Sequence, residues 1–193
     1  TKSDFARIWL IEEPPTWNEL LGGKGSVQIH VYTRSDSCGA AETWAAFMGK
    51  KQEDLLGIGV FGDPGLNEAV RKDALGVGFN NINYAYDATS LKPMTGTAIL
   101  PIDLNGNGKI DADESFYGDR DAITKAIAED KYPSPPARDL YLVAVRRASS
   151  TATSMARFAR GARLISPAER RSPLPTTNST AALTFARGTP RLV

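Results

Sequence analysis

The stretch "SVQIHVYTRSDSCGAAETWAAFMG", residues 26–49, indicates the fold because two secondary-structure patterns meet in it. Residues 26–34 alternate in polarity and are rich in β-branched side chains, which is typical of a strand. Residues 38–49 carry apolar side chains at helical spacing, and the predicted inward stripe is Ala41, Trp44, Ala45 and Met48. A strand, a short turn and a helix in immediate succession are typical of an α/β layer structure.

The same two patterns alternate along the rest of the body. Further strands are predicted at 57–62, 74–79, 97–103 and 138–145, and further helices at 16–23, 63–73 and 119–130. Thr16 is expected to cap the first of these helices, and Asp63 before Pro64 is expected to cap the second. The alternation predicts a mixed sheet flanked by helices.

Composition excludes several classes of protein. A single Cys rules out an internal disulfide and a multi-thiolate metal site. The net charge of +1 gives no general attraction to nucleic acid or to a membrane surface. No apolar run approaches the roughly 20 residues of a membrane span, and the chain has no basic head followed by an apolar signal segment. We therefore expect no nucleic-acid partner and no membrane span in this chain.

The turn between the predicted strand and helix has the residues of an anion site. A helix N-terminus presents unpaired N–H groups and a partial positive charge, and here these groups belong to Cys38, Gly39 and Ala40. Arg34 can make a two-pronged contact with a tetrahedral oxyanion. Asp36 is expected either to hold Arg34 in place or to accept the proton of a protonated phosphate. The alternative interpretation is a capped turn with an Arg–Asp surface pair.

Cys38 also raises the hypothesis of a nucleophile. A catalytic cysteine usually needs a base that is oriented by a third group. The sole histidine, His30, lies within the predicted strand between apolar neighbours, where a structural or surface role is more common. We therefore predict a binding protein and no enzyme.

The segment "DLNGNGKIDADE", residues 103–114, matches the 12-residue calcium loop of an EF-hand. Oxygen ligands are expected at positions one, three, five, seven (a backbone carbonyl), nine and twelve, which are Asp103, Asn105, Asn107, Lys109, Asp111 and Glu114. Gly108 permits the sharp turn at position six, and Ile110 is expected to anchor the loop. The alternative interpretation is an acidic Asn-Gly turn. A strand precedes the loop where an EF-hand has a helix, and a helix follows near Asp119. We therefore predict a structural Ca²⁺ site that joins the strand to the helix.

A family resemblance accompanies these motifs. The segment "YTRSDSCGAAETWAAFMG", residues 32–49, resembles the Arg-x-Asp-x-Ser-Gly-Thr turn and following helix of the phosphate-binding receptors of ABC importers, which have the type 2 periplasmic binding fold. Three segments resemble other parts of that family in the same order: "FARIWLIEEPPTWNEL" (5–20), "EAVRKDALGVGFNNINYA" (68–85) and "KYPSPPARDLYLV" (131–143). The resemblance implies that residues 1–143 form the second lobe of such a receptor. It also implies an extracytoplasmic location, a monomer, phosphate or a similar oxyanion as ligand, and an ABC permease as partner of the full-length protein.

Carried over by position, the resemblance assigns Arg34 as the anion-binding arginine, Asp36 as its neighbour and Gly39 as the glycine whose N–H binds the anion. Cys38 and Ala40 stand where the family often has Ser and Thr, so two hydroxyl donors are missing. The backbone donors remain, and oxyanion binding remains the expected function. The alternative is a calcium-stabilised structural or adhesion module whose anion site has decayed.

The composition changes where the resemblance ends. Residues 144–193 hold nine Arg and one Glu but no Asp or Lys, and they show no sustained helical or strand period. We predict a poorly ordered tail. A second hypothesis is that residues 144–193 are read in a shifted frame of a GC-rich gene. A nucleic-acid-binding arm is disfavoured because the tail lacks Lys and interleaved aromatic residues.

Overall fold

The computed structural model describes residues 1–22, 24–139 and 179–186 of the 193-residue chain. In chain order its elements are α1 (Lys2–Trp9), α2 (Trp17–Leu21), β1 (His30–Arg34), α3 (Gly39–Phe47), the 3₁₀ turn η1 (Gln52–Asp54), β2 (Ile58–Val60), α4 (Gly62–Lys72), β3 (Gly76–Asn81), α5 (Ile82–Ala85), β4 (Ala98–Ile99), α6 (Arg120–Ala128), β5 (Ala137–Asp139) and β6 (Ser179–Ala186). The mixed α/β class predicted from the sequence is confirmed.

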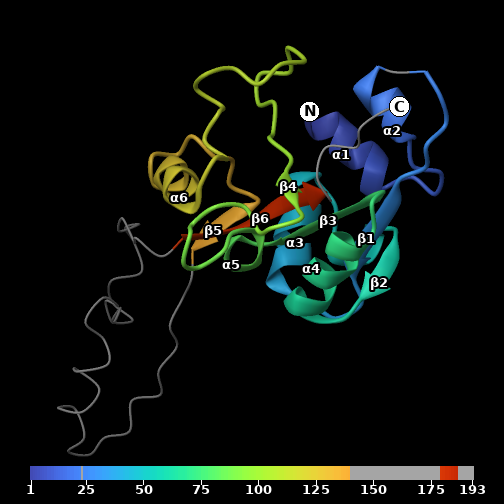
Figure 1. Ribbon diagram of the computed structural model, residues 1–193, viewed down its shortest axis with the longest axis horizontal. Coiled ribbons are helices and arrows are strands. Elements are labelled where there is room, and N and C mark those ends of the chain that lie inside the picture. Colours follow the sequence, from blue (N-terminus) through green and yellow to red (C-terminus); the bar gives the residue numbers. More distant parts are fainter. Residues whose placement is uncertain (23, 140–178, 187–193) are drawn as a thin grey trace, which may run out of the picture.

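One mixed sheet organises these elements (Figure 1). Its strand order is β2-β1-β3-β6-β4, and β5 pairs with β6 beside this path. The pairs β1–β2 and β1–β3 are parallel, whereas β6 runs antiparallel to β3, β4 and β5. Figure 1 shows α1 and α2 together at one end of the molecule and α6 at the other. The parallel half of the sheet carries the turn of the predicted anion site.

Local sequence signals account for the helix ends. Thr16 accepts the N–H of Glu19, and the Glu19 carboxylate accepts the N–H of Thr16, which forms a capping box at the start of α2. Gly22 ends α2 at φ 70°, in the left-handed region that favours glycine. The α3 stripe of Ala41, Trp44, Ala45 and Met48 is buried as predicted. These features confirm the predictions made from residues 16–23 and 38–49.

An aromatic core joins α1, α3 and β3. The Trp9 and Trp44 rings meet edge to face with their centroids 5.4 Å apart, and Phe79 of β3 stacks on Trp44 at 6.1 Å. On the α4 side, Leu66 and Val70 are fully buried. A Cβ atom at Gly78 would lie 2.9 Å from Val70 Cγ2, so α4 approaches β3 at this glycine. This packing holds the ends of β1 and β3 and the start of α4 in one place.

Two predictions about the elements were wrong. Helix α4 begins at Gly62 with Phe61 in the capping position, so Asp63 does not cap it. The side chain of Asp63 is instead engaged by Arg34 and Asn81, because an ion pair with a buried guanidinium is stronger than a cap bond.

The prediction of a poorly ordered tail is wrong for residues 179–186, because they form β6 in the sheet. The other residues of 144–193 lie outside the described residues, as do residues 140–145 of the predicted last strand.

Candidate functional site

The centre of the predicted anion site is a buried arginine held by two carboxylates. Arg34 ends β1, and its side chain is only 6% exposed. Its Nε donates to Asp36 Oδ1 at 2.8 Å, and its Nη2 donates to Asp36 Oδ2 at 2.6 Å. Its Nη1 donates to Asp63 Oδ1. The guanidinium is therefore fixed in orientation by partners from the following turn and from α4.

Neighbouring backbone and amide groups hold Asp36 and Asp63 in place. Asn81 Nδ2 donates to Asp63 Oδ2 at 2.7 Å, and Asn80 Nδ2 donates to the Asp63 carbonyl at 2.8 Å. The Gly62 N–H donates to Asp36 Oδ1 at 3.1 Å. These residues lie at the carboxyl ends of the parallel strands, the edge where α/β sheets usually bind ligands.

The pair of Arg34 and Asp36 stays ionised. The hydrogen bonds from Arg34, supported by the Gly62 N–H, hold the pKa of Asp36 well below its usual range. The same contact raises the pKa of Arg34 against the opposing effect of burial. Both Asp36 oxygens already accept hydrogen bonds, so the contacts support the role of holding Arg34 over that of accepting a proton from the anion.

The first turn of α3 lies next to this cluster. Gln52 joins the two, because its Oε1 accepts the Cys38 N–H at 3.1 Å and its Nε2 donates to the Asp36 carbonyl at 2.8 Å. Cys38 caps α3 through its Sγ, which accepts the Ala41 N–H at 3.4 Å. No acceptor among the described residues takes the N–H groups of Gly39 and Ala40. Two helix donors are thus available for a ligand.

Two residues of this site were missed by sequence reasoning. Asp63 has the sequence pattern of a helix cap before proline, which conceals its ion pair with Arg34. Arg138 of β5 brings its guanidinium against Gly39, where a Cβ atom would overlap its two terminal nitrogens. Arg138 is about one hundred positions from α3, and sequence periodicity gives no signal for such distant contacts.

The residues proposed for a cysteine mechanism have different partners. His30 Nδ1 lies 2.6 Å from Asp73 Oδ2, and the Tyr32 hydroxyl donates to the same oxygen at 2.8 Å. Within the described ranges no hydrogen bond joins His30 to Cys38. The contacts of His30 are those of a structural residue.

The calcium-loop sequence forms a closed loop around two buried carboxylates. Asp103 is 6% exposed and Glu114 is 3% exposed. Asp103 accepts the N–H groups of Gly106 and Gly108, at 2.6 and 2.8 Å. Glu114 accepts those of Leu104, Asn105 and Asp111, at 2.8, 3.1 and 3.2 Å. The first and last predicted ligands are thus held inside one loop.

Two of the predicted middle ligands, Asn105 and Asn107, donate hydrogen bonds to a third carboxylate. The Nδ2 groups of Asn105 and Asn107 donate to Asp111 Oδ2, at 2.9 and 2.7 Å. In the described part of the chain, no ion pair neutralises Asp103, Asp111 or Glu114. Hard oxygen donors with uncompensated negative charge fit Ca²⁺.

The carboxylates of loop 103–114 are not sufficient by themselves to coordinate a metal ion. Among the described residues, no three His, Cys, Asp or Glu side chains are gathered for a metal ion. A calcium ion here would need the amide oxygens of Asn105 and Asn107 and the Lys109 carbonyl as well. Ile110, expected to anchor the loop, is 40% exposed, so that prediction was wrong.

A tyrosine cluster closes the base of the loop. The Tyr117 hydroxyl accepts the Ile102 N–H at 3.1 Å, and the Tyr86 hydroxyl donates to the Tyr117 carbonyl at 3.0 Å. The Tyr132 ring packs on Tyr117 with centroids 6.3 Å apart. Strand β4 precedes the loop and α6 follows it with Asp119 as its cap, which confirms the predicted flanks.

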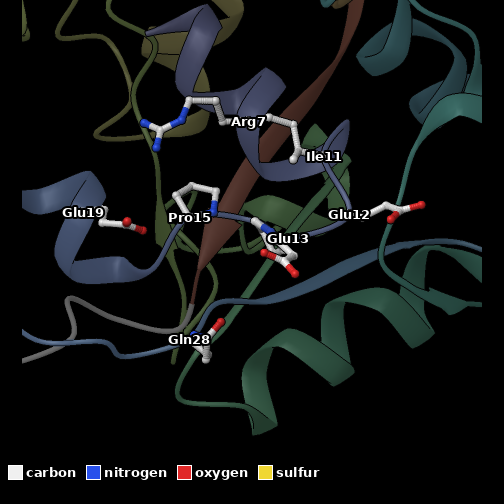
Figure 2. Close-up of a pocket in the computed structure, with 8 residues that line it drawn as sticks. Arg7, Ile11, Glu12, Glu13, Pro15, Glu19 and Gln28 are labelled. Carbon is white, nitrogen blue, oxygen red and sulfur yellow. The ribbon is translucent and has the colours of Figure 1, made fainter.

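A hollow of about 520 Å³ lies apart from both predicted sites. It is lined by Arg7, Ile11, Glu12, Glu13, Pro14, Pro15, Glu19 and Gln28. Figure 2 shows its charged side chains spread around the hollow instead of directed at one point. Glu19 is already engaged in the α2 capping box. This hollow therefore has no convergent set of polar groups.

Neither a membrane helix nor a relative of known function helps to identify this protein among the described residues and the comparisons made. Among the described residues, no helix has the length and apolar character needed to cross a membrane. Comparisons of the chain with protein-family models, curated proteins and solved structures found no match.

Proposed function

We propose that this chain binds a tetrahedral oxyanion such as phosphate at the turn formed by residues 34–40. It would act as the anion-binding lobe of an extracytoplasmic receptor for ABC-type phosphate import, and a Ca²⁺ ion in loop 103–114 would stabilise it. The observation that carries the proposal is the buried guanidinium of Arg34, which Asp36 and Asp63 orient beside the first turn of α3, where the N–H groups of Gly39 and Ala40 have no acceptor among the described residues.

The donors left over are sufficient for an oxyanion. A guanidinium has five N–H donors, and three of those of Arg34 are engaged by the two carboxylates. The other two, with the N–H groups of Gly39 and Ala40, give a charge-assisted set at a helix N-terminus. Donors from one lobe alone bind weakly, so we expect a modest affinity.

The calcium ion would have a structural role. Carboxylate, amide and carbonyl oxygens of Asp103, Asn105, Asn107, Lys109, Asp111 and Glu114 would hold it. Its charge would offset the repulsion among the three carboxylates and clamp the connection between β4 and α6.

Calorimetric titration of inorganic phosphate into the full chain tests the anion proposal. We expect saturable 1:1 binding in the wild type and no binding in Arg34→Gln, because the glutamine amide lacks the positive charge. Arg71→Gln removes a charge from the exposed side of α4 and serves as the control. The absence of both heat and thermal stabilisation at millimolar phosphate would contradict the proposal.

Replacing Cys38 by serine is expected to strengthen the site. A serine hydroxyl accepts the Ala41 N–H as a better cap than Sγ, and its own proton is free to bind the anion. We expect about 0.5–1 kcal/mol of added stability and a two- to tenfold lower Kd for phosphate, about the effect of one hydrogen bond. Denaturant unfolding and calorimetry measure the two effects. Cys38→Ala lacks the cap acceptor, so it should be less stable and bind phosphate more weakly than the wild type. Equal stability and equal Kd values for the wild type, Cys38→Ser and Cys38→Ala would contradict the cap geometry.

The alternative function is a calcium-stabilised structural or adhesion module with a decayed anion site. It is favoured by the missing hydroxyls at positions 38 and 40 and by the two carboxylates that already engage Arg34. Stabilisation by calcium together with no response to phosphate would support this alternative.

A further inference from the structure

Arg138 of β5 lies against the first turn of α3 although it belongs to a distant part of the chain. Its guanidinium occupies the space that a Cβ atom at Gly39 would fill, so only glycine permits this contact. The backbone around it is anchored, because the Ala137 N–H donates to the Pro133 carbonyl at 3.0 Å and Ser134 Oγ donates to the Ala137 carbonyl at 2.9 Å. The half-buried Arg138 is thus held beside the proposed anion site.

Among the residues that the structure describes, Arg138 has no partner that balances its charge. Arg34 has two carboxylate partners, whereas no hydrogen bond or ion pair joins Arg138 to another described residue. The N-terminus of α3 carries a partial positive charge of its own, so a cation packed against Gly39 is repelled unless a bound anion contacts both groups. The position of Arg138 is therefore favourable when an anion is bound.

We propose that Arg138 is a second arginine ligand of the oxyanion, an inference that rests on the proposed function of this site. Arg34 and Arg138 would approach the anion from β1 and β5, and the N–H groups of Gly39 and Ala40 would approach it from α3. The guanidinium of Arg138 replaces the donors that Cys38 and Ala40 lack. Two arginines and a helix N-terminus favour a doubly charged tetrahedral anion, such as hydrogen phosphate or sulfate, over a singly charged anion such as nitrate.

Calorimetry on the full chain tests this with phosphate, sulfate and nitrate as probes. We expect Arg138→Ala to raise the Kd for phosphate and sulfate about tenfold, which corresponds to about 1.4 kcal/mol. Arg138→Lys keeps the positive charge but loses the planar guanidinium that can donate two parallel hydrogen bonds. Its Kd should therefore lie between those of the wild type and Arg138→Ala. The control is Arg120→Ala, which removes a half-buried arginine whose guanidinium donates to Asn83 Oδ1 and should leave the Kd unchanged.

Gly39→Ala gives an independent test that leaves Arg138 in the chain. The added Cβ displaces the flexible end of Arg138, and alanine is the better helix former, so the variant should keep its stability. Its Kd should rise about as much as that of Arg138→Ala, and the double variant should be no weaker than either single one.

The outcomes separate the two proposals. If the wild type binds phosphate and Arg138→Ala binds it equally or more tightly, Arg138 is no ligand and this inference alone is overturned. If the wild type binds none of the three anions, the proposed function and this inference both fail.

Discussion

With calcium bound, the chain is expected to melt about 5–10 °C higher than in the presence of a chelator, and Glu114→Ala is expected to abolish the difference. A ligand at one hundred times its Kd stabilises the folded state by about 2.7 kcal/mol. Each kcal/mol raises the Tm of a chain of this size by about 2–4 °C. Glu114 is the proposed ligand whose loss should matter most, because it is buried and both of its carboxylate oxygens accept backbone N–H groups of the loop.

The variants must separate calcium binding from the hydrogen bonds of Glu114. Glu114→Gln keeps an oxygen that can accept the N–H groups of Leu104 and Asn105 but has no charge, so it should retain more stability without calcium than Glu114→Ala and still respond weakly to the ion. Glu53→Ala removes an exposed glutamate and should keep the full calcium response. Identical melting curves with and without chelator in the wild type would refute the calcium site.

Arg34→Ala is expected to lower the free energy of unfolding by about 3 kcal/mol and to abolish phosphate binding. Removing one member of a buried ion pair leaves its partners uncompensated, which typically costs 3–5 kcal/mol. Here the lower end applies, because the side chains of Asp36 and Asp63 are 25% and 20% exposed. Urea unfolding measures the loss.

A second substitution tests the cause of that loss. In the Arg34→Ala background, Asp63→Asn removes one of the two facing carboxylates and should recover part of the stability. In the wild type, Asp63→Asn should be destabilising because it removes the negative charge of the ion pair with Arg34. A loss below about 0.5 kcal/mol for Arg34→Ala, the level of an ordinary surface substitution, would show that the cluster is not a buried ion pair.

The pH dependence of stability has a defined sign. The pKa of Asp36 is lowered in the folded chain, mainly by its hydrogen bonds with Arg34. The stability from this shift is therefore present above the unfolded pKa of about 4 and is lost as the pH falls toward the folded pKa. In Arg34→Ala only the smaller effect of the Gly62 N–H remains, so that variant should lose less stability than the wild type on acidification below pH 4.

Local features were predictable from the sequence because they depend on neighbouring residues. Thr16 and Gly22 bound α2 through capping within a few positions, and the α3 stripe follows from helical spacing. The turn from Arg34 to Ala40 was placed correctly between β1 and α3 for the same reason. Only one of the two ion pairs in this turn was predictable from the sequence. Arg34–Asp36 joins near neighbours in the chain, whereas Arg34–Asp63 joins β1 to α4.

Features that depend on distant pairing were not predictable. Asp63 can serve as a cap or as an ion-pair partner, and only the packing of α4 on the sheet selects the second role. The contact between Arg138 and Gly39 depends on the position of β5. The short apolar run in residues 179–186 shows no distinctive period, and its strand character comes from the partners β3, β4 and β5.

The position of β6 has a consequence for the order of assembly during synthesis. It fills the gap between β3 and β4, yet it follows β3 by roughly one hundred residues, a long-range pairing of the kind that slows folding. Until β6 leaves the ribosome, the β3 edge has backbone groups without their final partner beside the buried side chains of Val77 and Phe79. The nascent chain thus exposes an unpaired strand edge while roughly one hundred residues are added, a state in which intermediates are prone to aggregate.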